Sequence, residues 1–248
     1  MFDLHVAVIS DVHGNRWALE AVLRDIKRRE IAAIVNLGDV LYGPLDPSGT
    51  AQILVDMDIP TVLGNQDRIL LDPPRGKERV PTLDYVLNVL TPEHIEWLKT
   101  FPMTLVVYDD FYLCHGSPDN DTKYLLADVT EAGVSLRSSD SLMKKLETVE
   151  QRIVLCGHDH VPRSVLLPDG RIIIDPGSVG LPAYDDALPF PHVMETGTPH
   201  ARYCIVTRNE DGWWMEDIAV PYDWQAASDA ALTHGRSDWA EWLRLGRA

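Results

Sequence analysis

Apolar runs alternate with polar segments along most of the chain, and their spacing predicts alternating strands and helices. Residues 4–10 are apolar and rich in β-branched side chains, which favours a strand. The segment that follows repeats apolar residues at helical spacing, at Leu19, Val22, Leu23 and Ile26. Further apolar runs predict strands over 31–38, 59–64, 104–109, 111–116, 152–157, 163–168, 171–175 and 202–207. Because these runs are apolar along nearly their whole length, we expect sheets that are covered on both faces.

The connections between these runs indicate that the sheets are mixed. Asp109-Asp110 and the Pro-Asp-Gly at 168–170 fit tight turns between antiparallel strands, whereas helical segments separate the early strands. Thr91 and Pro92 supply a cap and a first-turn proline for a helix over 92–99. The sequence therefore predicts an α/β fold with mixed sheets.

The last quarter of the chain gives weaker signals. Residues 183–200 contain three prolines and no period, so we expect a long irregular loop, inserted before the strand at 202–207. Such a loop forms either a lid or wall over a site, or a surface segment that packs elsewhere. The tryptophans beyond it indicate a C-terminal hairpin and two short helices within 222–247, packed against the same domain. We expect one domain over 1–248.

Composition narrows the class of protein. The chain has 248 residues, of which 45% are hydrophobic, and this is enough for a sizeable core. A formal net charge of −16 disfavours non-specific binding to nucleic acids or anionic membranes. The N-terminal residues lack the basic segment of a signal peptide, and no apolar run reaches the length of a membrane span, so we expect a cytoplasmic protein. Cys114, Cys156 and Cys204 lie in strand-like runs and are expected to be reduced, buried thiols.

Five predicted strand ends carry side chains that can bind a metal ion. These side chains are Asp11, His13, Asp39, Asn65, His115, His158 and His160. Loops beyond the carboxyl ends of strands in α/β sheets gather in one crevice, so residues far apart in the sequence can meet there. Each motif alone fits a helix cap, a turn or a surface histidine. Five of them, each beside a glycine, favour a shared metal site.

The chemistry of these seven side chains limits the kind of metal. They offer oxygen and imidazole nitrogen without thiolate, which suits Mn, Fe, Ni or Zn ions and disfavours an iron–sulfur cluster or a structural zinc site. Seven protein ligands are too many for one ion. They fit two divalent ions that share a carboxylate.

The order of the motifs, D-x-H, G-D, G-N-x-D, H-G and G-H-x-H, resembles that of the calcineurin-like metallophosphoesterase superfamily over residues 6 to about 180. The stretches at 37–47 (LGDVLYGPLDP), 115–118 (HGSP) and 175–182 (DPGSVGLP) are similar to its small bacterial and archaeal phosphodiesterase branch. The resemblance implies a four-layer αββα sandwich with two mixed β-sheets and a dinuclear metal centre at the sheet ends. It also implies a bridging Asp39, a first ion held by Asp11, His13 and His160, and a second held by Asn65, His115 and His158.

The function that the resemblance implies is a metal-dependent phosphoesterase with a metal-bound hydroxide as nucleophile. Its catalytic residues would include Asp39, Asn65, Gln66 and His115. Most of the superfamily has histidine where this chain has Gln66, and an amide does not titrate, although it can hydrogen-bond a phosphoryl oxygen. We therefore expect diesters and other esters with good leaving groups as substrates. Further candidates for substrate binding are Asn15, Arg68, His192 and His200.

Three other interpretations stay open. A non-catalytic or weakly catalytic scaffold or binding protein would keep the fold, and loss of ligands would be its signature. A phosphomonoesterase or protein phosphatase would keep the same site, as would a metal hydrolase that cleaves a non-phosphorus bond. Assays against mono- and diesters with each metal distinguish these possibilities. As partners we expect a small phosphorylated substrate and no membrane, and the oligomeric state stays open.

Overall fold

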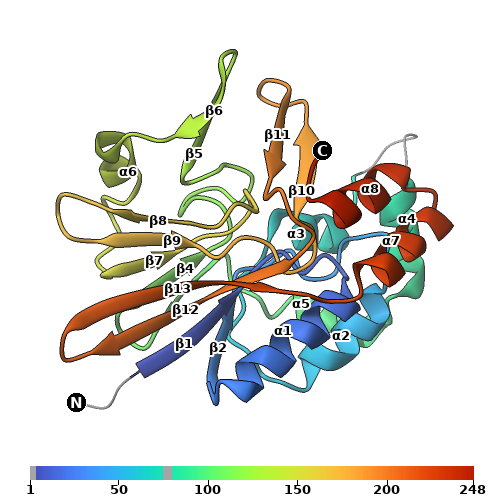
Figure 1. The fold of residues 1–248 in the computed structure, drawn as a ribbon, viewed down its shortest axis with the longest axis horizontal. Coiled ribbons are helices and arrows are strands. Elements are labelled where there is room, and N and C mark those ends of the chain that lie inside the picture. Colours follow the sequence, from blue (N-terminus) through green and yellow to red (C-terminus); the bar gives the residue numbers. More distant parts are fainter. Residues whose placement is uncertain (1–3, 75–79) are drawn as a thin grey trace.

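Two β-sheets packed face to face form the centre of the computed structural model, which describes residues 4–74 and 80–248 (Figure 1). The first sheet has the strand order β13-β12-β1-β2. Its strands are β1 (Leu4–Ile9), β2 (Ala33–Asn36), β12 (Ala201–Asn209) and β13 (Gly212–Val220). β1 runs parallel to β2 and antiparallel to β12, so the sheet is mixed, as the sequence predicts.

The second sheet has the strand order β3-β4-β7-β9-β8. Its strands are β3 (Thr104–Val107), β4 (Phe111–Cys114), β7 (Ile153–Leu155), β8 (Arg163–Leu166) and β9 (Ile172–Asp175). The central strands β4, β7 and β9 are parallel, and the edge strands β3 and β8 pair antiparallel with their neighbours. This sheet is also mixed, and the parallel strands end on the same side.

The facing sides of the two sheets share an apolar core. Val8 of the first sheet and Leu113 and Leu155 of the second are fully buried in it. The outer face of the first sheet packs against a group of helices, and the outer face of the second packs against α6 (Ser139–Lys145). The helices of the first group are α1 (Arg16–Arg28), α2 (Pro47–Val55), α3 (Asn65–Leu71), α4 (Pro81–Val89) and α5 (Pro92–Leu98). The order of layers is helix, sheet, sheet, helix, which is the predicted four-layer sandwich.

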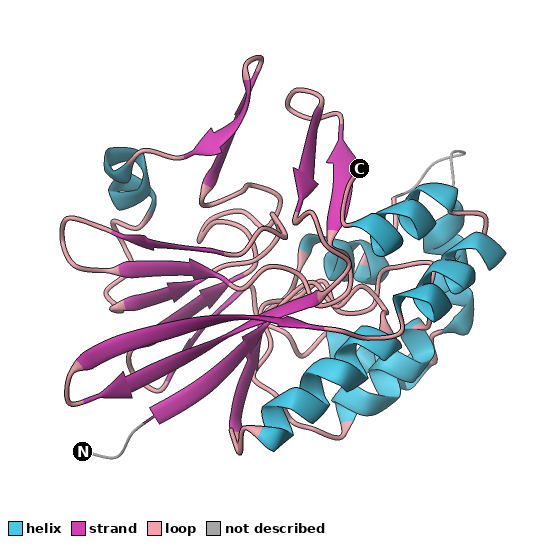
Figure 2. Ribbon diagram, in the orientation of Figure 1, coloured by secondary structure: helices cyan, strands magenta, loops and turns pink. Residues whose placement is uncertain are grey.

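Two hairpins and a pair of C-terminal helices complete the described chain. The hairpins, β5–β6 and β10–β11, extend beyond the sheets on the same side of the molecule (Figure 1). Their strands are β5 (Ala127–Thr130), β6 (Gly133–Leu136), β10 (Ala183–Asp186) and β11 (His192–Glu195). The helices α7 (Trp224–Thr233) and α8 (Ser237–Leu245) lie on the side where most helices gather (Figure 2).

The β10–β11 hairpin corrects the expectation of an irregular loop over 183–200. The two strands pair antiparallel, with Asp186 opposite His192. Side chains alternate along β11, since His192 and Met194 are buried and Val193 is exposed. This period of two extends over four residues only, and the surrounding prolines conceal it. A short amphipathic strand was therefore the signal that sequence reasoning missed.

Other expectations about local structure are confirmed or refined. The helix expected over 92–99 is α5, and the C-terminal hairpin and helices are β12–β13, α7 and α8. Residues 59–64 form no strand and contribute an isolated bridge between Asn36 and Thr61. The three cysteines are free and buried, as expected. Within the described ranges, no helix is long and apolar enough to span a membrane.

Candidate metal centre

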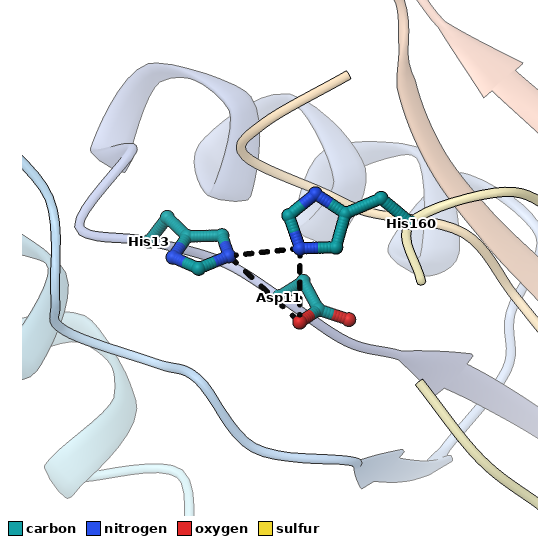
Figure 3. A group of neighbouring side chains, drawn as sticks. All are labelled: Asp11, His13 and His160. Carbon is teal, nitrogen blue, oxygen red and sulfur yellow. Dashed lines mark hydrogen bonds and ion pairs between the residues drawn. The ribbon is translucent and has the colours of Figure 1, made fainter. Parts of the chain in front are cut away.

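The first group of candidate metal ligands comes from two loops, the one after β1 and the one after β7. Figure 3 shows Asp11, His13 and His160 with their ligand atoms facing one another. The two Nε2 atoms of the histidines are 3.1 Å apart, and His160 Nε2 is 3.2 Å from Asp11 Oδ1. His13 Nε2 is 3.8 Å from the same oxygen. Atoms at these separations can all reach a single ion at ordinary metal–ligand distances of about 2.0–2.2 Å.

The second group lies beside the first and combines the ends of β2, β4 and β7. Asp39, His115 and His158 form it, with His115 Nε2 3.4 Å from Asp39 Oδ2. The amide oxygen of Asn65, the first residue of α3, is 3.0 Å from the same Nε2. Asp11 Oδ1 is 4.0 Å from His115 Nε2, so the two groups are contiguous. The structure thus brings together all seven side chains that the strand-end pattern singled out.

Backbone carbonyls fix the tautomers of three of these histidines. A ring nitrogen that faces a carbonyl oxygen must carry a proton, so in the neutral ring the other nitrogen presents a lone pair. The Nδ1 atoms face the carbonyls of Tyr42 (3.0 Å, from His13), Leu37 (2.7 Å, from His115) and Leu181 (2.8 Å, from His160). In the neutral form of each ring, the Nε2 atom therefore presents its lone pair to the other candidate ligands.

A cation would resolve the contacts among these acceptors. The two facing Nε2 lone pairs of His13 and His160 repel each other, and Asp11 Oδ1 is buried without a hydrogen-bond partner among the described residues. Burying a carboxylate oxygen costs free energy unless the oxygen is paired or coordinates a metal. The donor set therefore fits divalent cations, and the outer carbonyl contacts are of the kind that orient metal-ligating histidines.

The electrostatics of the second group also favour positive charge. Burial opposes protonation of His115, but Asp39 and Asp11 outweigh it and raise the pKa of this imidazole to about 10. Burial lowers the pKa of His13 and of His158 to about 4, so both rings are neutral at pH 7. The protonated ring of His115 thus balances part of the negative charge of Asp39 and Asp11. A metal ion at His115 Nε2 would supply the charge that a proton otherwise brings.

Most of the candidate ligands have a backbone conformation that is rare for their residue types. Asp11, His13, Asp39, His158 and His160 have φ angles of 54°, 52°, 52°, 74° and 63°, all in the left-handed region. This conformation costs about 1–3 kcal/mol in a residue other than glycine, and it persists only where the surrounding structure requires it. Five of them at one site indicate that the loops are shaped to aim these side chains, rather than to make ordinary turns.

The close approach of Asp39 explains why a glycine precedes Asn65 and Gln66. A Cβ atom on Gly64 would lie 2.1 Å from Asp39 Oδ1 and 2.3 Å from the Asp39 amide nitrogen, so only glycine lets these loops approach. Asp67 strengthens the same contact, because its carboxylate accepts hydrogen bonds from the amides of Val40 (2.9 Å) and Gly64 (3.3 Å). The stretch 61–70 is therefore built to hold α3 against the loop that carries Asp39.

A pocket of about 320 Å³ opens onto the candidate metal centre. Five candidate ligands form its floor: His13, Asp39, Asn65, His158 and His160. Gln66 lines it as well, and its Oε1 is buried without a partner among the described residues. Other parts of the lining come from two places that sequence reasoning did not connect with the site. These are the β10–β11 hairpin, through Tyr184, Asp185 and Asp186, and the C-terminal region, through Arg236, Asp238, Trp239 and Trp242.

Four predicted substrate-binding residues take part in contacts elsewhere. Asn15 is fully buried and caps α1, with its side chain bonded to Ala18 N and to the carbonyl of Gly180. The other three do not line the pocket either: Arg68 pairs with Asp121, His192 bonds to Tyr124, and His200 packs on Trp224 at 5.6 Å. Of the predicted substrate-binding residues, Gln66 is the one that faces the pocket. Short-range motifs did not reveal these long-range partners.

The β10–β11 hairpin is anchored to the candidate ligands through two tyrosines. The Tyr184 hydroxyl lies 3.0 Å from the His158 carbonyl and 2.8 Å from the Tyr124 hydroxyl, which lies 3.0 Å from His192 Nε2. The Tyr184 ring meets His160 edge-on at 4.7 Å, and the Tyr124 ring lies 4.8 Å from His158. This hairpin is therefore a wall packed against the site.

Removing the Tyr184 hydroxyl is expected to weaken metal binding. Tyr184→Phe keeps the ring against His160 but loses the hydrogen bonds that hold the loop of His158. Loss of a group that orients a ligand typically costs 10–100-fold in metal affinity, so we expect the Kd for Mn²⁺ to rise by about tenfold. Tyr85→Phe is the control, since it loses a hydroxyl bond to the Leu45 carbonyl (2.8 Å) away from the pocket. Calorimetry that gives equal Kd values for both variants would contradict the anchoring role.

The fold is that of the metallophosphoesterase class. Residues 4–196 match the family model of the calcineurin-like phosphoesterase superfamily domain, and the chain belongs to this superfamily. An uncharacterised protein of Methanocaldococcus jannaschii is 28% identical in an alignment that covers 98% of each chain. The superfamily uses divalent metals, and this chain has two candidate groups of ligands for them.

Two solved structures share the architecture along nearly the whole chain. A metallophosphoesterase from Sphaerobacter thermophilus superposes with a TM-score of 0.74 at 23% identity, covering 99% of this chain and all of that one. A hypothetical protein from Pyrococcus horikoshii gives the same TM-score at 19% identity, again covering 99% and 100%. At these identities the likeness establishes the fold. The identification of the fold made from the sequence motifs is thereby confirmed.

Proposed function

We propose that this chain is a dinuclear metal-dependent phosphoesterase that prefers small diesters with good leaving groups. The observation that carries the proposal is the convergence of seven oxygen and imidazole ligands on the floor of one pocket or directly beneath it. Two ions would be held, one by Asp11, His13 and His160 and one by Asn65, His115 and His158. Asp39 would bridge them.

The residues and the metals would divide the work of hydrolysis. When bound, two divalent cations activate a water molecule at neutral pH and neutralise the phosphoryl oxygens. Asp39 Oδ1 accepts a hydrogen bond from the backbone amide of Gln66 (2.8 Å), so the carboxylate that would bridge the ions fixes the position of Gln66 in the pocket. The Gln66 side chain cannot supply a titrating proton. Its NH₂ group would instead orient a phosphoryl oxygen by donating a hydrogen bond to it.

The charges around the pocket support diesters over monoesters. Asp185, Asp186 and Asp238 line its walls, against a single arginine, Arg236, among the described lining residues. A phosphodiester carries one negative charge and a monoester approaches two at neutral pH, so repulsion by the carboxylates disfavours the monoester more. With no imidazole at position 66, an ester whose leaving group needs no protonation is also the easier substrate.

The size of the pocket bears on the alternatives. A volume of about 320 Å³ lies at the lower end of ligand pockets and fits a small ester better than a folded phosphoprotein. A scaffold protein that had lost catalysis would be expected to lose ligands, and all seven are in place. Both observations support a small-molecule hydrolase.

The test is a substrate panel with defined metals. Purified protein is stripped with a chelator, reloaded with Mn²⁺, Fe²⁺, Ni²⁺ or Zn²⁺, and assayed with aryl diesters, aryl monoesters, alkyl phosphates and a carboxylic ester. We expect the highest kcat/KM for aryl diesters and no turnover without metal. Hydrolysis of the carboxylic ester alone, or of no ester with any metal, would refute the proposal.

A further inference from the structure

Arg236 lines the same pocket as five of the candidate ligands. It immediately precedes α8, and it belongs to the C-terminal region that lies beyond the family match at 4–196. It shares the pocket with Asp39 and Asn65, and it is the one lysine or arginine among the described residues that line it. A lone cation that faces a site for anionic esters is a candidate for substrate recognition.

Neighbouring side chains hold the Arg236 guanidinium in a fixed orientation. Its Nε donates to Asp238 Oδ1 (2.9 Å), its Nη2 donates to Asp238 Oδ2 (2.6 Å), and its Nη1 donates to Thr82 Oγ1 (2.7 Å). The Cζ atom lies 5.3 Å from the centre of the Trp239 ring. Contacts on three sides preorganise the group, which lowers the entropic cost of binding a ligand.

The guanidinium keeps hydrogen-bonding capacity for a further partner. An arginine has five N–H groups, and the bonds to Asp238 and Thr82 use three of them. The two that remain, one on Nη1 and one on Nη2, can donate to the oxygens of a phosphate or carboxylate. The side chain is 25% exposed and lines the pocket that the candidate ligands also line.

Trp239 connects Arg236 with the candidate metal centre. The Arg236 guanidinium lies over the Trp239 ring, and that ring meets the His13 ring edge-on at 5.8 Å. One side chain therefore separates the guanidinium from a candidate ligand.

We propose that Arg236 is a specificity-determining residue that binds an anionic oxygen of the substrate across the pocket from the metals. This inference rests on the proposed function of the same site. The oxygen belongs either to the phosphoryl group itself or to a second anionic group that the substrate carries. Both sources present the same chemistry to the guanidinium, and a matched pair of ligands separates them.

Binding of two stable phosphonates to the Mn²⁺-loaded protein tests the inference without turnover. Propylphosphonate offers the phosphoryl oxygens alone, and 3-phosphonopropionate adds a carboxylate. Hydrogen bonds to charged groups are strong, so Arg236→Gln is expected to raise the Kd by about 10–100-fold for whichever ligand uses the guanidinium. If the Kd of both phosphonates rises in Arg236→Gln, the guanidinium binds the phosphoryl group. If only the Kd of 3-phosphonopropionate rises, the guanidinium binds the second anionic group. Either result supports the proposal.

Two further variants separate recognition from packing. Arg16→Gln is the control, because Arg16 also pairs with an aspartate, Asp46, at 3.0 Å and lies 5.6 Å from a tryptophan ring, but away from the pocket. Thr82→Val loosens the anchor of Arg236 and keeps its charge, so it should raise the Kd less than Arg236→Gln does. Unchanged Kd values in Arg236→Gln, or no binding of either phosphonate to the unmodified protein, would overturn the inference. Failure of the proposed function shows separately, as absence of ester turnover.

Discussion

Asp39→Asn is expected to reduce bound metal from two equivalents to at most one and to lower kcat by roughly 10³-fold. Asp39 Oδ1 accepts a hydrogen bond from the backbone amide of Gln66, and Oδ2 faces His115 Nε2. One oxygen therefore holds the neighbouring loop, while the other faces the candidate ligands. In the asparagine variant the oxygen would keep the bond to Gln66, and the NH₂ group, which cannot bind a cation, would face His115. Loss of several kcal/mol of charge stabilisation corresponds to a rate effect of this size.

Elemental analysis and steady-state kinetics after reconstitution with each metal measure this effect. Asp223→Asn is the matched control, because Asp223 caps α7 through Ala226 N (3.0 Å) and asparagine caps as well. The control should keep two equivalents of metal and full activity. Two ions and normal kcat in Asp39→Asn would show that this carboxylate bridges nothing. Less than one equivalent in the unmodified protein, with every metal, would refute the dinuclear centre itself.

Much of the fold could be predicted because long apolar runs determine it locally. The run at 4–10 becomes β1 and the run at 171–175 becomes β9, and both are buried on two faces. Weaker segments depend on tertiary contacts. Residues 59–64 are mostly apolar, but they join β2 through a single bridge at Thr61, and Gly64 then packs closely against Asp39. Local pattern does not encode such a contact.

The floor of the site could also be predicted, but its walls could not. Candidate ligands such as His13 and His158 carry a local signature, since each follows an apolar run and stands next to a glycine. Trp239 and Tyr184 carry none, because a buried aromatic residue in a helix or hairpin usually belongs to the core. They reach the pocket only because α8 and β10 pack over it, and that packing depends on contacts across the whole chain.

Gln66→His is expected to restore part of the general acid catalysis that this site lacks. The Gln66 side chain lines the pocket and its Oε1 is buried without a partner among the described residues, so an imidazole there would face the substrate. Positioned general acids contribute about 10²–10⁴-fold. Asp67 stands next in the sequence, but its carboxylate already accepts hydrogen bonds from the backbone amides of Val40 and Gly64. The gain should therefore lie at the lower end of that range.

The dependence of rate on the leaving group decides what Gln66 does. For the unmodified protein, kcat/KM should fall steeply from nitrophenyl to phenyl to alkyl esters, and Gln66→His should flatten this series by raising the rates of the poorest leaving groups most. That gain should decline as pH rises through the ordinary imidazole pKa of about 6.5, since only the protonated ring can donate. Gln52→His, on the exposed side of α2, controls for adding a histidine elsewhere. If Gln66→His changes the rates of good and poor leaving groups equally, position 66 only binds phosphoryl oxygens. Because His192 is bonded to Tyr124 and His200 lies outside the pocket, the proton would then come from water.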